Sequence, residues 1–236
     1  MEVRSLYREP ERQEQVEWGA LELHDVFKIF RAGDTDIVAL RGLDLRIEEG
    51  ELVAVLGPSG SGKTTFLHLA AGLDQPSAGE VRVAGRSLSR LDEGDLAAYR
   101  ARELALVFQT GNLWPALTAR ENVAVSLRLS GRDASTADEA LAHFGLAERV
   151  RHRAGALSGG EQQRVAIAAA AARRAPLVLA DEPTAELDER NEEIVLDEFR
   201  RLRNDFETTV VVVTHSPAVA AWADRVVEIR DGRVVT

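Results

Sequence analysis

The sequence predicts an α/β protein whose core is a mixed sheet with a phosphate-binding loop, with an antiparallel sheet at its edge and an inserted helical region. Three observations predict this fold. Short continuous apolar segments are typical of buried parallel strands, longer alternating segments are typical of half-buried antiparallel strands, and a stretch in the middle of the chain lacks strand patterns.

The half-buried strands come first in the chain. LELHDVFKIF (residues 21–30) and DIVALRGLDLRIEEG (residues 36–50) alternate apolar and polar residues, which predicts an antiparallel edge sheet. Near the end of the chain, Asp231 and Gly232 lie between alternating apolar residues and predict a hairpin turn.

Four further segments are expected to form buried parallel strands. Each is a short apolar run that ends in a glycine-rich loop or a polar residue: residues 51–57, 104–109, 176–183 and 208–215. Polar groups at the carboxyl ends of such strands mark the crevice in which open α/β sheets bind ligands. We therefore expect the functional site at this edge of the sheet.

The strand pattern disappears between Leu113 and about Arg174. Residues 119–131, 134–150 and 157–174 indicate helices with capping residues and glycine stops. We expect a helical subdomain over about residues 113–174, inserted into the α/β core.

The last of these helices has an unusual start. Ser158 and Glu161 have the spacing of a capping box, yet the first turn contains Gly159 and Gly160, which are poor helix formers. A helix N-terminus with bare backbone N–H groups favours an anion. The sequence therefore predicts that an anionic group comes close to this helix.

Composition limits the classes of protein that fit. The 236 residues are 45% hydrophobic, enough for a full core in a domain spanning residues 19–236, after a charged and flexible tail over residues 1–18. The net charge of −10 argues against nucleic acid as a partner, and the absence of cysteine excludes thiolate sites and disulfides. No apolar run approaches the roughly 20 residues needed to span a bilayer, and no signal peptide is recognisable, so we expect a cytoplasmic protein.

The strongest motif is a phosphate-binding loop, GPSGSGKTT. It fits G-x-x-x-x-G-K-[ST] and lies between a predicted strand and a predicted helix, as its mechanism requires. Backbone N–H groups from Ser59 to Thr64 would surround the β-phosphate, Lys63 would reach the β and γ oxygens, and the Thr64 hydroxyl would ligate Mg²⁺. The nucleotide-binding residues predicted here are Gly57, Pro58, Ser59, Gly60, Ser61, Gly62, Lys63, Thr64 and Thr65.

Polar residues at the other strand ends complete a hydrolytic site. Asp181 is expected to hold Mg²⁺ through water, and Glu182 to orient the attacking water as the catalytic base. Gln109 can contact both the metal and the water, and His215 can hydrogen-bond either the γ-phosphate or Glu182. The chain has no NKxD guanine motif, which favours ATP over GTP.

Taken in order, GPSGSGKTT, Gln109, LSGGE, LVLADEP, AELD and His215 resemble the ATP-binding subunit of ATP-binding cassette (ABC) transporters, over nearly the whole chain from about Leu21. The resemblance implies an ABC ATPase core of the phosphate-loop NTPase class, with ATP and Mg²⁺ as cofactors. LSGG is the signature motif of this family. The presence of this signature motif disfavours a phosphate-loop kinase.

The resemblance also implies a head-to-tail dimer of two copies or of homologous subunits. The signature of one chain, Ser158 to Glu161, would complete the ATP site of the other. This would explain why the chain has an anion-binding helix start in addition to its phosphate-binding loop. Asp188 would touch the partner's site, and Phe30 would stack on adenine, although Phe27 lies nearby. Ala185 and Glu186 depart from the family's usual SALD loop.

The segment from Leu88 to Val123 resembles the subunits that serve lipoprotein release and macrolide efflux. This subgroup implies an integral membrane permease that holds the chain on the inner face of the membrane, and export or release of a lipidic, lipoprotein or drug-like substrate. The permease would be contacted near Leu113, Trp114 and Leu117; these residues could instead pack within the helical subdomain. A cell-division ABC ATPase that regulates cell-wall hydrolysis, and a soluble ABC ATPase without a permease, remain alternatives.

Overall fold

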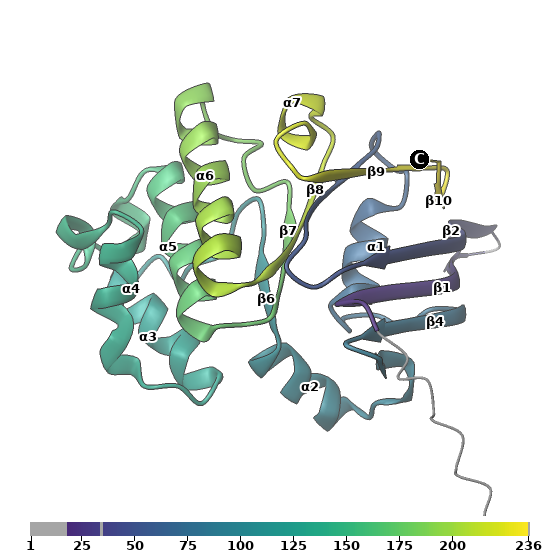
Figure 1. Ribbon diagram of the computed structural model, residues 1–236, viewed down its shortest axis with the longest axis horizontal. Helices are drawn as coiled ribbons and strands as arrows, with labels where there is room; N and C mark the ends of the chain where they lie inside the picture. The colour runs from purple at the N-terminus through teal and green to yellow at the C-terminus, as the bar shows by residue number, and fades with distance from the viewer. Residues whose placement is uncertain (1–17, 34, 236) are drawn as a thin grey trace, which may run out of the picture.

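The computed structural model describes residues 18–33 and 35–235, and the predicted tail therefore lies outside the described residues except for Trp18. Trp18 lies against the edge sheet, where the Arg82 guanidinium is 4.6 Å from the centre of its ring. The chain forms two sheets, with helices gathered mainly on one side of the larger sheet (Figure 1).

The larger sheet has six strands in the order β10-β9-β3-β8-β7-β6. Their bounds are β3 (Leu52–Leu56), β6 (Leu104–Val107), β7 (Leu177–Asp181), β8 (Thr209–Thr214), β9 (Arg225–Arg230) and β10 (Arg233–Val234). All neighbouring pairs are parallel except β9 and β10. This arrangement confirms the mixed sheet and the four predicted parallel strands.

The predicted hairpin turn between β9 and β10 is confirmed. Arg230 pairs with Arg233, and the two residues between them, Asp231 and Gly232, have φ values of 47° and 74°. Two consecutive positive φ angles are typical of the type I′ turn that Asp-Gly favours.

The smaller sheet is antiparallel and has the order β2-β1-β4-β5. Its strands are β1 (Leu21–Ala32), β2 (Thr35–Ile47), β4 (Ala78–Val83) and β5 (Arg86–Ser87). The first two are the strands that alternation predicts. The sequence patterns did not predict β4, which buries only Val81 and Val83, the two-residue strand β5, or the helix α2 (Glu93–Arg102), which buries only Leu96 and Tyr99.

Three helices lie between β6 and β7 in the chain: α3 (Ala119–Leu129), α4 (Ala137–His143) and α5 (Gly159–Arg173). Besides α2, the other helices of the described residues are α1 (Lys63–Ala70), α6 (Glu189–Phe206), α7 (Pro217–Ala220) and four 3₁₀ turns, η1 (Leu88–Arg90), η2 (Ala134–Thr136), η3 (Ala147–Arg149) and η4 (Ala154–Ala156). Within residues 18–33 and 35–235, no helix is both long and apolar enough to cross a membrane.

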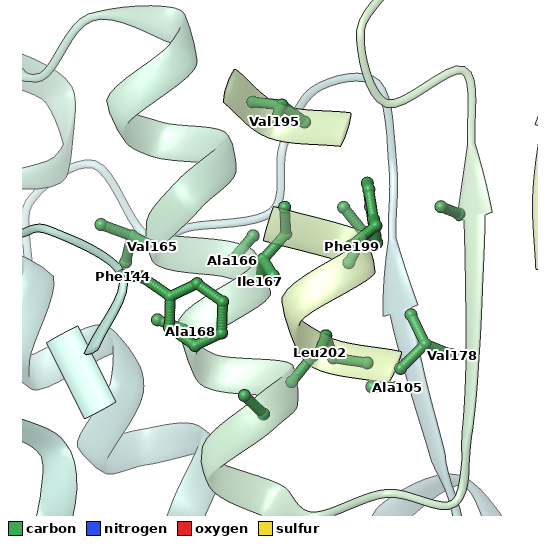
Figure 2. Packing of buried hydrophobic residues seen from close by; sticks show 14 of the residues in the cluster. Ala105, Phe144, Val165, Ala166, Ile167, Ala168, Val178, Val195, Phe199 and Leu202 are labelled. Carbon is green, nitrogen blue, oxygen red and sulfur yellow. The ribbon is translucent and has the colours of Figure 1, made fainter. Parts of the chain in front are cut away.

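The core lies on both faces of the larger sheet. Strand β8 shows this arrangement, since its successive side chains belong alternately to two apolar clusters. Val210 and Val212 belong to the cluster that α3, α5 and α6 cover, and Val211 and Val213 belong to the cluster beneath α1 and the edge sheet. Figure 2 shows the first cluster, in which side chains of α5 and α6 meet Phe144 and the strand residue Val178. Burial on both faces explains why these strands are continuously apolar.

Candidate active site

The phosphate-binding loop joins β3 to α1 and depends on its glycines. Gly60 and Gly62 have φ values of 80° and 106°, in the left-handed region that glycine adopts at little cost. A Cβ atom on Gly62 would lie 2.6 Å from the carbonyl oxygen of Ala39, and one on Gly57 would overlap the carbonyl oxygen of Ile229. The loop backbone is therefore held closely between β2 and β9.

Lys63 is the first residue of α1, and its side chain folds back over the loop. Its ammonium donates hydrogen bonds to the carbonyl oxygens of Gly57 at 2.7 Å and Pro58 at 3.0 Å. Only 7% of the residue is exposed. This geometry holds one positive charge against the phosphate-binding loop, which suits a polyphosphate.

Thr64 and Asp181 come together although they are far apart in the sequence. The Thr64 hydroxyl lies 3.5 Å from Asp181 Oδ2, at the carboxyl end of β7. Burial raises the pKa of Asp181 above its ordinary value, and the neighbouring charge of Glu182 raises it further. A hydroxyl and a carboxylate beside a phosphate loop match how Mg²⁺ binds, through few protein oxygens together with water and substrate phosphates.

Glu182 and His215 meet at the ends of β7 and β8. His215 Nδ1 lies 2.8 Å from Glu182 Oε1. Glu182 has a φ of 45°, which is unusual for a residue with a side chain, and its N–H donates to the Val213 carbonyl at 2.9 Å. The predicted hydrogen bond between His215 and the Glu182 carboxylate is therefore present.

Gln109 follows β6 at the same edge of the sheet. Its Nε2 donates to Glu186 Oε1 at 3.3 Å, across to the loop after β7. Glu186 is one of the two residues that depart from the family loop, so this contact belongs to a position where the chain differs from the usual pattern.

The predicted capping box at the start of α5 is present. The Glu161 N–H donates to Ser158 Oγ at 3.3 Å, and Glu161 Oε2 accepts from the Ser158 N–H at 2.9 Å. Arg149 donates to the other oxygen of this carboxylate at 2.6 Å, and this hydrogen bond, followed by the one from Ser158, lowers the pKa of Glu161. The Glu161 carboxylate is thus engaged within its own chain.

The two signature glycines have different surroundings. Gly159 is exposed and Gly160 is buried. A Cβ atom on Gly160 would lie 2.7 Å from Asn191 Oδ1 of α6, so the close neighbour at this position is a side chain of the same chain. Among the described residues, neither glycine nor Ser158 forms a hydrogen bond to the phosphate loop.

Asp188 and Phe30, the two remaining predicted residues, lie at the start of α6 and on β1. Asp188 caps α6 and accepts from the N–H and the side-chain amide of Asn191, both at 2.9 Å, which lowers the Asp188 pKa. Phe30 is 41% exposed on β1, with the Lys28 ammonium 5.0 Å from its ring centre. An exposed aromatic ring on an edge-sheet strand is available for stacking.

Two of the three residues predicted to contact a permease, Leu113 and Trp114, line a cavity of about 170 Å³ between β6, α3 and α5, and Leu117 does not. Trp114 is 55% exposed at its rim, and its backbone N–H donates to Asn122 Oδ1 at 2.8 Å. Leu113 packs partly against the helical core, and Leu117 is half-buried.

Gln163 is a further side chain of this region that was not among the predicted site residues. It is 4% exposed and bonds to the loops after β6 and β7. A signal was present, because Gln163 lies on the same helical stripe as the buried residues Gly160, Ile167 and Ala170, where a polar side chain needs partners.

A phosphate loop after a parallel strand, with an acidic pair at the end of a nearby strand, defines a phosphate-loop nucleoside triphosphate hydrolase. Residues 40–185 match the family model described as ABC transporter, and the chain belongs to this family. It is an ATP-binding and ATP-hydrolysing subunit, and ATP and Mg²⁺ are its cofactors.

Individual proteins extend the match to nearly the whole chain. The chain is 42% identical to the lipoprotein-releasing system ATP-binding protein LolD of Geobacter metallireducens, over 91% of this chain and 97% of that protein. It is 45% identical to the macrolide export ATP-binding/permease protein MacB of Rhodopseudomonas palustris, over 91% of this chain but only 33% of that longer protein. A solved dimer of the ATP-binding cassette MJ0796, in a post-hydrolysis state with ADP and Pi, matches with a TM-score of 0.83 and 39% identity, over 92% of this chain and 97% of that chain.

Proposed function

We propose that two copies of this chain bind ATP between them, head to tail, and drive a membrane permease that exports or releases a lipidic, lipoprotein or drug-like substrate. The observation that carries this proposal is the separation of two anion-binding features within one chain. The phosphate loop and the acidic residues form one cluster, whereas the exposed start of α5 makes no hydrogen bond to that loop among the described residues. A partner chain would bring the two together.

Each chain would supply one half of an ATP site. The loop from Gly57 to Thr65 would hold the phosphates, and Thr64, Asp181 and Gln109 would hold Mg²⁺. Phe30 would stack on the adenine. From the second chain, Ser158 and the following glycines would present N–H groups to the γ-phosphate, and Asp188 would lie beside the same nucleotide.

Hydrolysis would depend on the contact between Glu182 and His215. Glu182 would accept a proton from the attacking water, and His215, bonded to it at 2.8 Å, would hold the carboxylate in place. Since Lys63 is already oriented inside the loop by two carbonyl oxygens, the phosphates would meet a preformed positive site.

Closure of the dimer would be the step that does work on the permease. A shift from mostly open to mostly closed requires about 5.5 kcal/mol of differential binding, which two γ-phosphates at a two-fold interface could supply. Hydrolysis would remove that energy and let the dimer open.

The permease would dock at the cavity beside Trp114. An exposed tryptophan next to a hollow, close to the loop that contains Gln109, suits an apolar helix of a partner. The relatives named for lipoprotein release and macrolide export support the substrate class, and the permease could be on the same chain, as the name of the MacB relative indicates, or on another.

The test is to isolate the tagged protein from membranes in mild detergent and identify the bound proteins by mass spectrometry. We expect an integral membrane protein that is lost in Trp114→Glu and kept in Leu73→Glu, a control that changes another exposed apolar residue of 48% exposure. Recovery with soluble partners alone, or equal recovery with both variants, would contradict the permease contact.

A further inference from the structure

The buried side chain of Gln163 joins three segments that belong to different parts of the site. Its Nε2 lies 2.9 Å from the carbonyl oxygens of both Phe108 and Gln109, and 3.0 Å from that of Pro183. Its Oε1 accepts a hydrogen bond from Asn112 Nδ2 at 2.8 Å. One amide group therefore connects α5 to the loop after β6 and to the loop after β7.

The loop after β6 is itself closed by a reciprocal pair of hydrogen bonds. Asn112 Oδ1 accepts from the Phe108 N–H at 2.7 Å, and Asn112 Nδ2 donates to the Phe108 carbonyl at 2.7 Å. The loop is thus a compact unit whose carbonyl oxygens point to Gln163. Movement of α5 would move this unit with it or break the hydrogen bonds.

The loop after β7 carries the other end of the connection. Pro183 directly follows Glu182, whose carboxylate meets His215. A side-chain amide has two protons, so the Gln163 Nε2 shares them among three carbonyl oxygens. This sharing requires the two loops to be held close together around the amide. Because Gln163 is buried, an unmade hydrogen bond would not be replaced easily by water.

We propose that Gln163 is a positioning residue that ties the signature end of α5 to the segments of Gln109 and Glu182. It touches neither nucleotide nor metal. It fixes the positions of Gln109 and Glu182 relative to the start of α5, which the second chain would contact. Closure of the dimer would then align Glu182 for hydrolysis. This inference rests on the proposed dimer.

The test compares two buried amides in the full-length protein. Asn122 is the matched control, because it is also 4% exposed and also bonds to several backbone groups, but these belong to Trp114, Leu117 and Thr118 within the helical region. Gln163→Met and Asn122→Leu each replace an amide by an apolar group of similar size. The measurements are kcat and KM for ATP and the melting temperature of each variant.

We expect Gln163→Met to lower kcat by about 10-fold to 100-fold with KM for ATP almost unchanged, the effect of a small misplacement of a catalytic group. Both Gln163→Met and Asn122→Leu should lower the melting temperature, by similar amounts. Asn122→Leu should nevertheless leave kcat at the parent value. Gln163→Glu, which retains the acceptor oxygen and the size but loses the amide protons, should show the same loss of kcat as Gln163→Met.

Parent kcat in either Gln163 variant would overturn the inference, and so would an equal loss of kcat in the Asn122 control. The proposed dimer is tested separately, by gel filtration of Glu182→Gln with ATP. If that variant stays monomeric, the proposed dimer fails, whereas the ratio of kcat values still decides whether Gln163 positions the hydrolytic residues.

Discussion

His215 Nδ1 lies 2.8 Å from Glu182 Oε1, which joins the ends of two neighbouring strands, β8 and β7. The contact holds Glu182 at the carboxyl edge of the sheet, in a left-handed backbone conformation with a φ of 45°. Positive φ is costly for a residue with a side chain and persists where its surroundings fix it. We therefore expect substitution of either residue to disturb the position of the Glu182 carboxylate.

Glu182→Gln should reduce ATP turnover by about 10²-fold or more, because the amide cannot accept a proton from water. Binding of ATP should persist, since the phosphate loop is unchanged. Turnover and ATP binding are measured on the purified variant, with Glu193→Gln, an exposed glutamate on α6, as the control. Parent turnover in Glu182→Gln would show that Glu182 is not the base.

Gly232→Ala should destabilise the protein and weaken ATP binding. A Cβ atom at Gly232 would lie 2.5 Å from the Ala39 carbonyl oxygen, and the Gly232 N–H donates to Ser61 of the phosphate loop at 2.9 Å. Gly131→Ala is the control, because its φ is also 74° but no atom lies within 4 Å of the added carbon.

The Gly131→Ala control should cost about 1–2 kcal/mol from the left-handed backbone alone. We expect Gly232→Ala to cost more, measured by urea unfolding, and to raise the dissociation constant for ATP. Equal losses of stability and equal affinities in the two variants would show that the C-terminal hairpin does not support the loop.

The stability contributed by Glu161 should depend on pH. Its pKa is lowered below 4.5 in the folded protein, first by Arg149 and then by the Ser158 N–H, so the stabilisation is present above the unfolded pKa and is lost as the pH falls through the folded value. Glu161→Gln should therefore be less stable than the parent at pH 7. The difference in unfolding free energy between parent and variant should shrink below about pH 4.5, as urea unfolding at several pH values would show. A difference that grows in acid would contradict the lowered pKa of Glu161.

Gly160→Ala should destabilise the junction of α5 and α6, because the new carbon would lie 2.7 Å from Asn191 Oδ1. We expect the loss in melting temperature to be largely recovered in the double variant with Asn191→Ala, since the two nearest obstructing atoms, Oδ1 and Cγ, are then absent and only Cβ at 3.2 Å remains. Gly159→Ala, whose nearest neighbour would be 3.3 Å away, serves as the control. No recovery in the double variant would mean that another contact requires Gly160.

Local patterns were sufficient to predict many elements. The apolar runs of β3, β6, β7 and β8, the Asp231-Gly232 turn and the capping box of α5 all depend on residues close in sequence. Strands β4 and β5 and helix α2 could not be predicted from pattern because each of them buries at most two side chains. The assignment of Glu182 and His215 to one edge of the sheet also followed from sequence, since both end parallel strands.

The sequence by itself determined the phosphate loop and the family, and it predicted the residues for hydrolysis, because a motif and its flanking periodicity fix local backbone geometry. Only the tertiary structure decided which distant residues meet. It placed β9 beside β3, Asn191 against Gly160, and Gln163 between the loops that follow β6 and β7. Such contacts depend on how strands and helices pack in three dimensions, and a buried polar side chain has its hydrogen-bond partners chosen by that packing.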